Sequence, residues 1–147
     1  MTGYETIVVA TDGSDCARAA GEHALELAAT YDATLHALYV VDATDLGLTT
    51  PSEVEVEEIR DSLRARGQRA VDEVVETAAD AGIDGVGEVR VGIPHEEILA
   101  YADAVGADLL VLGTHGRAGL RRYLLGSVAE RVVRIADPPV LTVHEEC

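Results

Sequence analysis

The sequence predicts an α/β fold in which one open, doubly wound parallel sheet of five strands carries helices on both faces. Short apolar runs alternate strictly with longer amphipathic or alanine-rich segments along the 147 residues. Strict alternation implies parallel strands joined by right-handed crossovers. The length suits a single domain, residues 1–147, and is too short for two comfortable domains.

Each expected strand is a short run of mainly β-branched or apolar residues. The expected strands are Ile7–Ala10, Leu35–Val41, a segment around Val89 and Val91, Asp108–Leu112 and Val140–Val143. Val89 and Val91 alternate with Glu88 and Arg90, which indicates a half-exposed strand at a sheet edge. The unbroken apolar run that follows Asp108 predicts a strand buried on both faces.

The first two helices are expected from their start signals. An alanine-rich helix runs from Cys16 to Thr30 with Ser14 as its N-cap. After a loop from Ala43 to Thr50, the run Thr50-Pro51-Ser52-Glu53 has capping-box spacing and predicts a second helix that ends at Gly82. Residues spaced by four or seven predict its buried face: Ile59, Leu63, Ala70, Val74 and Ala78.

Two further helices complete the alternation. Pro94 begins the third, which buries Ile98, Leu99 and Ala102. Ser127 is expected to cap the fourth, which ends at Pro138-Pro139. The apolar face of the fourth helix is expected to consist of Val128, Val132 and Ile135.

The net charge of the chain limits the kinds of molecule that it is expected to bind. The chain has 27 Asp and Glu against 11 Arg, no Lys, and a net charge of −16. Such a surface repels nucleic-acid backbone and anionic membrane. One interpretation is an ordinary acidic protein. The other interpretation is adaptation to the salt-rich cytoplasm of a halophilic archaeon, and the absence of Lys, Phe and Trp favours it. At molar salt the Debye length is about 3 Å, so the acidic side chains no longer repel one another.

The targeting signals and the cysteines of the sequence indicate in which cellular compartment the protein lies. No apolar run approaches the ~20 residues that span a bilayer, and the first residues lack the basic and apolar regions of a signal peptide. We therefore expect a cytoplasmic protein. Its two cysteines, Cys16 and Cys147, lack metal-ligand spacing and are expected to be free thiols.

The candidate binding residues lie at the ends of two expected strands. The first strand ends in Thr11-Asp12-Gly13-Ser14, and the fourth in Gly113-Thr114-His115-Gly116. In doubly wound sheets, ligands bind beyond the carboxyl ends of the strands at the switch point. Gly126-Ser127 then opens an amphipathic segment, and a helix start offers free N–H groups and a positive dipole to phosphate. These loops predict a nucleotide site.

This pattern resembles the universal stress protein (UspA) family, specifically its ATP-binding branch. The family spacing of Gly, two residues, Gly, nine residues, Gly and then Ser or Thr is met by Gly113, Gly116, Gly126 and Ser127. The resemblance implies a Rossmann-like sheet of strand order 3-2-1-4-5, with adenine nucleotide alpha-hydrolase-like topology. It also implies an ATP-binding regulator of the stress response that forms a homodimer through the last strand, Val140–Val143.

The resemblance also assigns roles to individual residues. Asp12 and Val40, beside the opening Ala10-Thr11, would border the adenine. Leu112, Gly113, His115 and Gly116 would follow the ribose and phosphates. Gly126, Ser127 and Val128 would receive the phosphate tail.

The nearby cations and polar residues leave alternatives open. Arg117 adjoins Gly116, which favours contact with phosphate, whereas Arg121 and Arg122 suit either phosphate or surface carboxylates. His115 is interpreted as a positional hydrogen-bonding residue rather than a catalytic one. Asp12 suits either an Mg²⁺ carried by the nucleotide or a turn carboxylate that bonds its own backbone.

The sequence is compatible with three functions. The favoured one is an ATP-binding sensor. A slow ATPase or phosphotransferase is disfavoured, because no Lys holds a γ-phosphate and neither GxxxxGK[ST] nor GxGxxG after a strand is present. The third is a scaffold dimer whose pocket is empty or holds another adenylate such as AMP.

Overall fold

The computed structural model describes residues 3–43, 53–114 and 126–144, and they form a five-stranded sheet of order β3-β2-β1-β4-β5. Every pairing in this sheet is parallel. The strands are β1 (Thr6–Ala10), β2 (Thr34–Asp42), β3 (Gly85–Gly92), β4 (Leu109–Gly113) and β5 (Val140–Val143). The predicted fold class and strand order are confirmed, and β3 lies at a sheet edge as its alternating pattern indicated.

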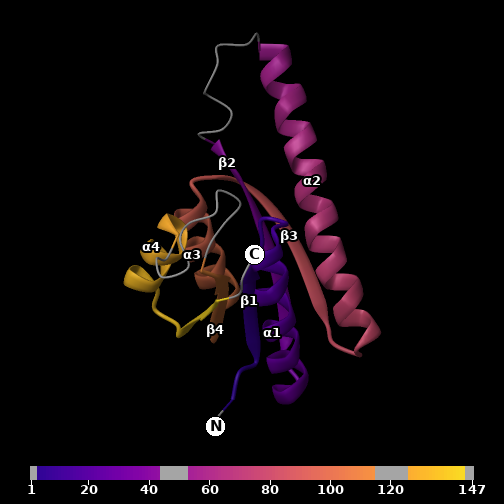
Figure 1. The fold of residues 1–147 in the computed structure, drawn as a ribbon, viewed down its shortest axis with the longest axis vertical. Coiled ribbons are helices and arrows are strands. Elements are labelled where there is room, and N and C mark those ends of the chain that lie inside the picture. Colours follow the sequence, from indigo (N-terminus) through magenta and orange to yellow (C-terminus); the bar gives the residue numbers. More distant parts are fainter. Residues whose placement is uncertain (1–2, 44–52, 115–125, 145–147) are drawn as a thin grey trace.

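In the described part of the chain, four helices cover the two faces of the sheet, two on each side (Figure 1). They are α1 (Asp15–Tyr31), α2 (Glu53–Asp80), α3 (Pro94–Val105) and α4 (Ser127–Ile135). Helices α1 and α2 pack on one face, and α3 and α4 pack on the other. None of the helices in the described part of the chain combines the length and apolar content that a membrane span requires.

Successive residues of the central strands supply two separate apolar cores. Ile7 and Val9 of β1 face the α1 and α2 layer, whereas Val8 between them faces the α3 and α4 layer. All three are fully buried. Full burial of one such side chain contributes about 1.5–3 kcal/mol, which explains why these strands are continuous apolar runs.

The face of α2 differs in part from the sequence prediction. Ala78 is fully buried, but Ile59 is 40% exposed, so its predicted burial is wrong. Figure 1 shows the reason: the N-terminal part of α2 extends beyond the carboxyl ends of the strands. Periodicity identifies the face that a helix turns inward, but it does not say where the sheet beneath that face ends. Val71, which the prediction omitted, is fully buried in the core.

The apolar face of α4 also differs from the prediction. Ala129 and Val132 are buried on this helix, whereas Ile135 is 57% exposed. Helix α4 ends at Ile135, and the extended Ala136 that follows turns the chain toward β5. The last apolar position of the pattern therefore falls outside the core.

A glycine inside α2 is required by an aromatic ring beneath it. A Cβ built on Gly67 would lie 2.6 Å from Cδ1 of Tyr39. Tyr39 belongs to β2 and is 4% exposed, so its ring has no free space into which it can move. Glycine at position 67 lowers helix propensity by about 1 kcal/mol relative to alanine, but it allows α2 to pack closely on β2.

We expect Gly67→Ala to destabilise the protein although alanine favours helix. Overpacking a buried contact costs about 1–3 kcal/mol, which outweighs the propensity gain of about 1 kcal/mol. Gly21→Ala is the matched control, because a Cβ at Gly21 in α1 meets nothing within 4 Å. Urea denaturation should show Gly21→Ala at or above wild-type stability and Gly67→Ala below it. Equal stabilisation by both variants would contradict this account of Gly67.

A polar network lies within the α3 side of the sheet. Nδ1 of His36 on β2 is 2.8 Å from the hydroxyl of Tyr101 on α3. The guanidinium of Arg90 lies 4.9 Å from the centre of the Tyr101 ring and pairs with Glu88 and Glu97. Burial lowers the pKa of His36. Burial, followed by the charge of Glu88, raises the pKa of Tyr101 against the opposing charge of Arg90.

The lowered pKa of His36 predicts a loss of stability in acid. Because the folded-state pKa lies below the unfolded value of about 6.5, the unfolded chain binds more protons. The contribution of His36 is therefore present above about pH 6.5 and falls as the pH drops below it. The stability advantage of wild type over His36→Asn should shrink between pH 7.5 and 5.5. The exposed His23 provides the control variant His23→Asn; a constant advantage over His36→Asn would refute the prediction.

Candidate functional site

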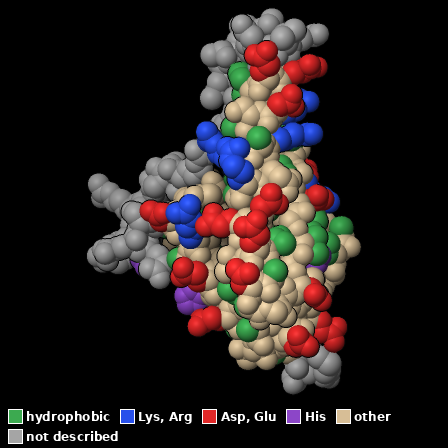
Figure 2. Space-filling view, turned by 90° about the vertical axis from the view of Figure 1, so that its right-hand side faces the viewer, with side chains coloured by type: hydrophobic (Ala, Val, Ile, Leu, Met, Phe, Trp, Pro, Cys, Tyr) green, Lys and Arg blue, Asp and Glu red, His purple; other side chains and the backbone are tan. Residues whose placement is uncertain are grey.

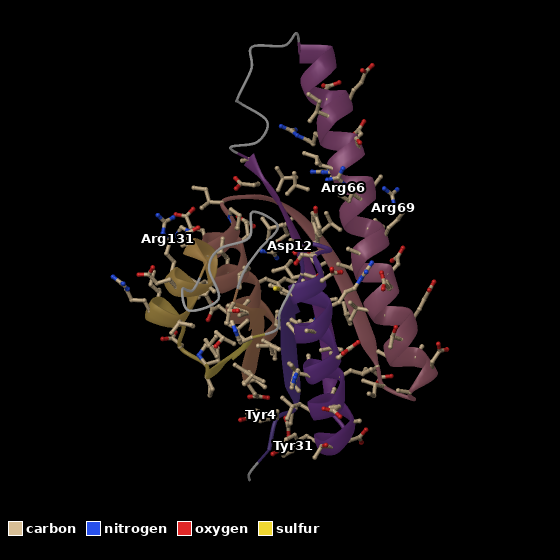
Figure 3. All side chains as sticks on the ribbon, in the orientation of Figure 1. Tyr4, Asp12, Tyr31, Arg66, Arg69 and Arg131 are labelled. Carbon is tan, nitrogen blue, oxygen red and sulfur yellow. The ribbon has the colours of Figure 1, made fainter. Side chains whose placement is uncertain are left out.

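The candidate site is built on the pairing of β1 with β4. Val9 pairs with Val111 in this parallel ladder, so the turns after both strands leave the same edge of the sheet. Here the chain order reverses, because β2 and β3 lie on one side of β1 and β4 and β5 on the other. Figure 3 labels Asp12 at this carboxyl edge, where β1 passes into α1. The predicted switch point is thus in place.

The turn after β1 is held by its own side chains. Oδ1 of Asp12 accepts a hydrogen bond of 2.9 Å from the N–H of Ser14, and Oγ1 of Thr11 accepts one of 3.2 Å from the N–H of Gly13. The side chain of Ser14 accepts a bond from the N–H of Ala17, which confirms Ser14 as the N-cap of α1. At least one oxygen of Asp12 therefore has the structural role that the sequence left open.

Several predicted residues share one apolar floor beneath this edge. Leu112 is 3% exposed and belongs to the core on the α3 and α4 side. Ala10, Val40 and Val128 are half-buried and pack against the same core. The structure thus brings together residues from β1, β2, β4 and α4 that lie far apart in the sequence.

Gly113 at the end of β4 lies close to the first turn of a helix. A Cβ on Gly113 would lie 3.1 Å from the carbonyl oxygen of Cys16 and 3.2 Å from its carbonyl carbon. These backbone atoms belong to the first turn of α1, which therefore packs directly against the end of β4. The sequence pattern suggested glycine for close approach to phosphate, and the structure adds an intramolecular reason for it.

The residue after Gly113 joins β4 to two other elements. Thr114 is 7% exposed. Its N–H donates to the carbonyl of Val143 at the end of β5 (3.0 Å), and its own carbonyl accepts from the N–H of Gly126 before α4 (2.6 Å). Sequence reasoning placed Thr114 inside the motif without singling it out. A hydroxyl-bearing residue directly at the end of a buried strand was the available signal.

Three predicted site residues lie outside the described part of the chain: His115, Gly116 and Arg117. Arg121 and Arg122 lie there too. Among residues 3–43, 53–114 and 126–144, no group of three His, Cys, Asp or Glu side chains is arranged to hold a metal ion.

The start of α4 supplies donors for an anion. Its N-cap is Gly126 rather than Ser127, so the expectation that Ser127 caps the helix is wrong. Ser127 is the first helical residue and is exposed. The first bond of the helix runs from the N–H of Glu130 to the carbonyl of Gly126 (2.9 Å). The preceding N–H groups of Ser127, Val128 and Ala129 consequently have no acceptor within the helix.

The cysteine beneath the site also differs from expectation. Cys16 is 1% exposed and is bonded in a disulfide. The expectation of a free thiol at Cys16 is therefore wrong. The positions of cysteines in the sequence do not reveal their distances in the folded chain, and those distances decide whether a disulfide can form.

Comparison with known families and relatives covers nearly the whole chain. Residues 3–144 match the model of the Universal stress protein family. Universal stress protein MJ0531 of Methanocaldococcus jannaschii is 44% identical over 143 residues, which cover 97% of this chain and 83% of that protein. The similarity is thus not confined to the glycine motif.

Solved structures agree with the fold. The structure of protein MJ0577 of Methanocaldococcus jannaschii is 29% identical, covers 99% of each chain and has a TM-score of 0.89. A universal stress protein solved in complex with cAMP is 32% identical, covers 97% of this chain and 98% of its own, and has a TM-score of 0.67.

Proposed function

The chain belongs to the universal stress protein family, and we propose that it binds ATP at the carboxyl edge of β1 and β4 and acts as a regulator of the stress response. Asp12 and Val40 border the adenine. The ribose and phosphates follow Leu112, Gly113, His115 and Gly116, with Arg117 at the phosphates. The phosphate tail ends at Gly126, Ser127 and Val128, and an Mg²⁺ bound to the phosphates accompanies it.

The start of α4 is the observation that carries this proposal. Three successive N–H groups without intrahelical acceptors lie next to the exposed hydroxyl of Ser127. This turn is joined to the carboxyl end of β4 by the hydrogen bond from Gly126 to Thr114. Such donors, together with the positive end of the helix dipole, suit a phosphate chain.

The adenine half of the ligand is supported by different features. Ala10 and Val40 offer apolar surface beside the carboxylate of Asp12. The related universal stress protein solved with cAMP binds an adenine nucleotide. Among the described residues, the donors for the phosphates are the N–H groups at the start of α4 and the hydroxyl of Ser127. The chain has no lysine to hold a γ-phosphate, which favours binding over cleavage.

Substitutions at the start of α4 test the site. We expect Ser127→Ala to weaken ATP binding by about 1–2 kcal/mol, the scale of one hydrogen bond to a charged group. Gly126→Val should abolish binding, because a branched side chain would fill the phosphate space. Titration calorimetry with Mg-ATP measures both, and competition with AMP tests the preferred adenylate.

Ser62→Ala is the matched control, since Ser62 is exposed on α2, and it should bind ATP as wild type does. Thermal unfolding checks that each variant is folded. Wild-type affinity in both Ser127→Ala and Gly126→Val would place the site elsewhere.

We further propose that the protein forms a homodimer through β5. This strand lies at the edge of the sheet, and an unpaired edge is a template for pairing with another strand. Val140, Leu141 and Thr142 are only half-buried. The neighbouring α4 exposes 45% of Val133 and 57% of Ile135, so a partner would cover apolar surface on both elements.

The acidic composition supports the proposal of a salt-rich cytoplasm. Acidic side chains, in red, are scattered along the face that carries α2 in Figure 2, among basic and hydrophobic side chains. At low ionic strength a net charge of −16 opposes the compact state by self-repulsion. At molar salt, screening within about 3 Å removes this cost.

A KCl series tests salt adaptation and dimer formation together. Stability against urea should rise steeply as KCl increases from low to molar concentration, and sedimentation should show a dimer in the high-salt samples. A parallel series in sucrose separates charge screening from general exclusion of the cosolute. Full stability without KCl would refute salt adaptation, and a monomer throughout would refute the dimer.

A further inference from the structure

Thr114 is 7% exposed although its side chain carries a hydroxyl, and it lies where three elements meet. We propose that Thr114 is a positioning residue for the phosphate half of the ligand. It fixes the start of α4 against the ends of β4 and β5. This inference rests on the proposed function, because it assigns a role within that same site.

The first link runs through the backbone of Thr114. Its carbonyl accepts the 2.6 Å bond from the N–H of Gly126, and the carbonyl of Gly126 in turn accepts the first helical bond of α4, from Glu130. The position of the Thr114 carbonyl therefore determines where α4 begins. It also determines where the free N–H groups of its first turn point.

The second link sets the position of Thr114 itself. Its N–H is bonded to the carbonyl of Val143 (3.0 Å), and its Oγ1 lies 3.3 Å from Nδ1 of His144. His144 directly follows β5, so the hydroxyl ties the end of β4 to the end of the neighbouring strand. With 7% exposure, Thr114 has little access to water that could replace a lost partner, and an unsatisfied buried group is costly.

The two halves of the site depend on this junction differently. The adenine half is formed by β1, β2 and the turn around Asp12, which has hydrogen bonds within itself, to α1 and to β2. The phosphate half is formed by the start of α4, which the junction at Thr114 holds. Loss of the hydroxyl should therefore weaken ligands that carry phosphates and spare adenosine. A general loss of folding would weaken both.

Thr114→Val removes the hydroxyl at nearly constant shape, and Thr114→Ser retains it. We expect Thr114→Val to bind ATP about 2- to 12-fold more weakly, the range of one lost hydrogen bond, with adenosine affinity unchanged. Thr114→Ser should restore ATP affinity. Equilibrium binding of ATP and of adenosine, measured for each folded variant, gives the comparison.

His144→Ala removes the partner of the hydroxyl and serves if Thr114→Val does not fold. It should reproduce the selective loss of ATP affinity, and the double variant should lose less than the sum of the two changes. His23→Ala is the control, because His23 is exposed on α1. Amide exchange at Gly126 and Glu130 should quicken in Thr114→Val without any ligand, which reports the position of α4 directly.

The outcomes separate the two proposals. A wild-type protein that binds no ATP would overturn the proposed function and the binding role of Thr114 with it. ATP binding by wild type with equal affinity in Thr114→Val and His144→Ala would overturn only the role of Thr114. Equal weakening of ATP and adenosine would overturn it too, by reducing Thr114 to a residue that stabilises the fold.

Discussion

The parallel pairing of β1 with β4 is the constraint on which the rest of the molecule depends. These strands are separated in the sequence by three helices and two strands, yet Ile7, Val8 and Val9 pair in register with Leu109, Leu110 and Val111. At the amino end, the Asp108 carboxylate accepts hydrogen bonds from the N–H groups of Glu5 and Thr6. The pairing reverses the chain order at this point and brings the turns after β1 and β4 together.

Close packing of helices on this sheet explains glycines that a ligand alone would not. Gly113 lets the first turn of α1 approach the end of β4, and Gly67 lets α2 approach the ring of Tyr39. Neither has the positive φ that requires glycine. Glycine at Gly113 therefore serves the packing of α1, and the proposed phosphate site at the start of α4 depends on that packed edge.

Much of this structure could be predicted from the sequence, because its main signals are local. Runs such as Ile7–Ala10 and Val140–Val143 identified strands, and Ser14 identified a helix start. The errors share a tertiary origin. Burial of Ile59 depends on where the sheet ends, the N-cap of α4 depends on the bond between Gly126 and Thr114, and the disulfide of Cys16 depends on distance through space. The contacts of Thr114 with Gly126, Val143 and His144 also join elements that lie apart in the sequence.

The use of backbone N–H groups as phosphate donors has a particular physical consequence. Side-chain donors can turn to meet a ligand, but the N–H groups at the start of α4 are fixed by the helix, and the helix is fixed by its junction with Thr114. Affinity in the proposed site therefore depends on residues that never touch the ligand. A positioning residue at such a junction can affect binding as much as Ser127, although its side chain does not contact the ligand.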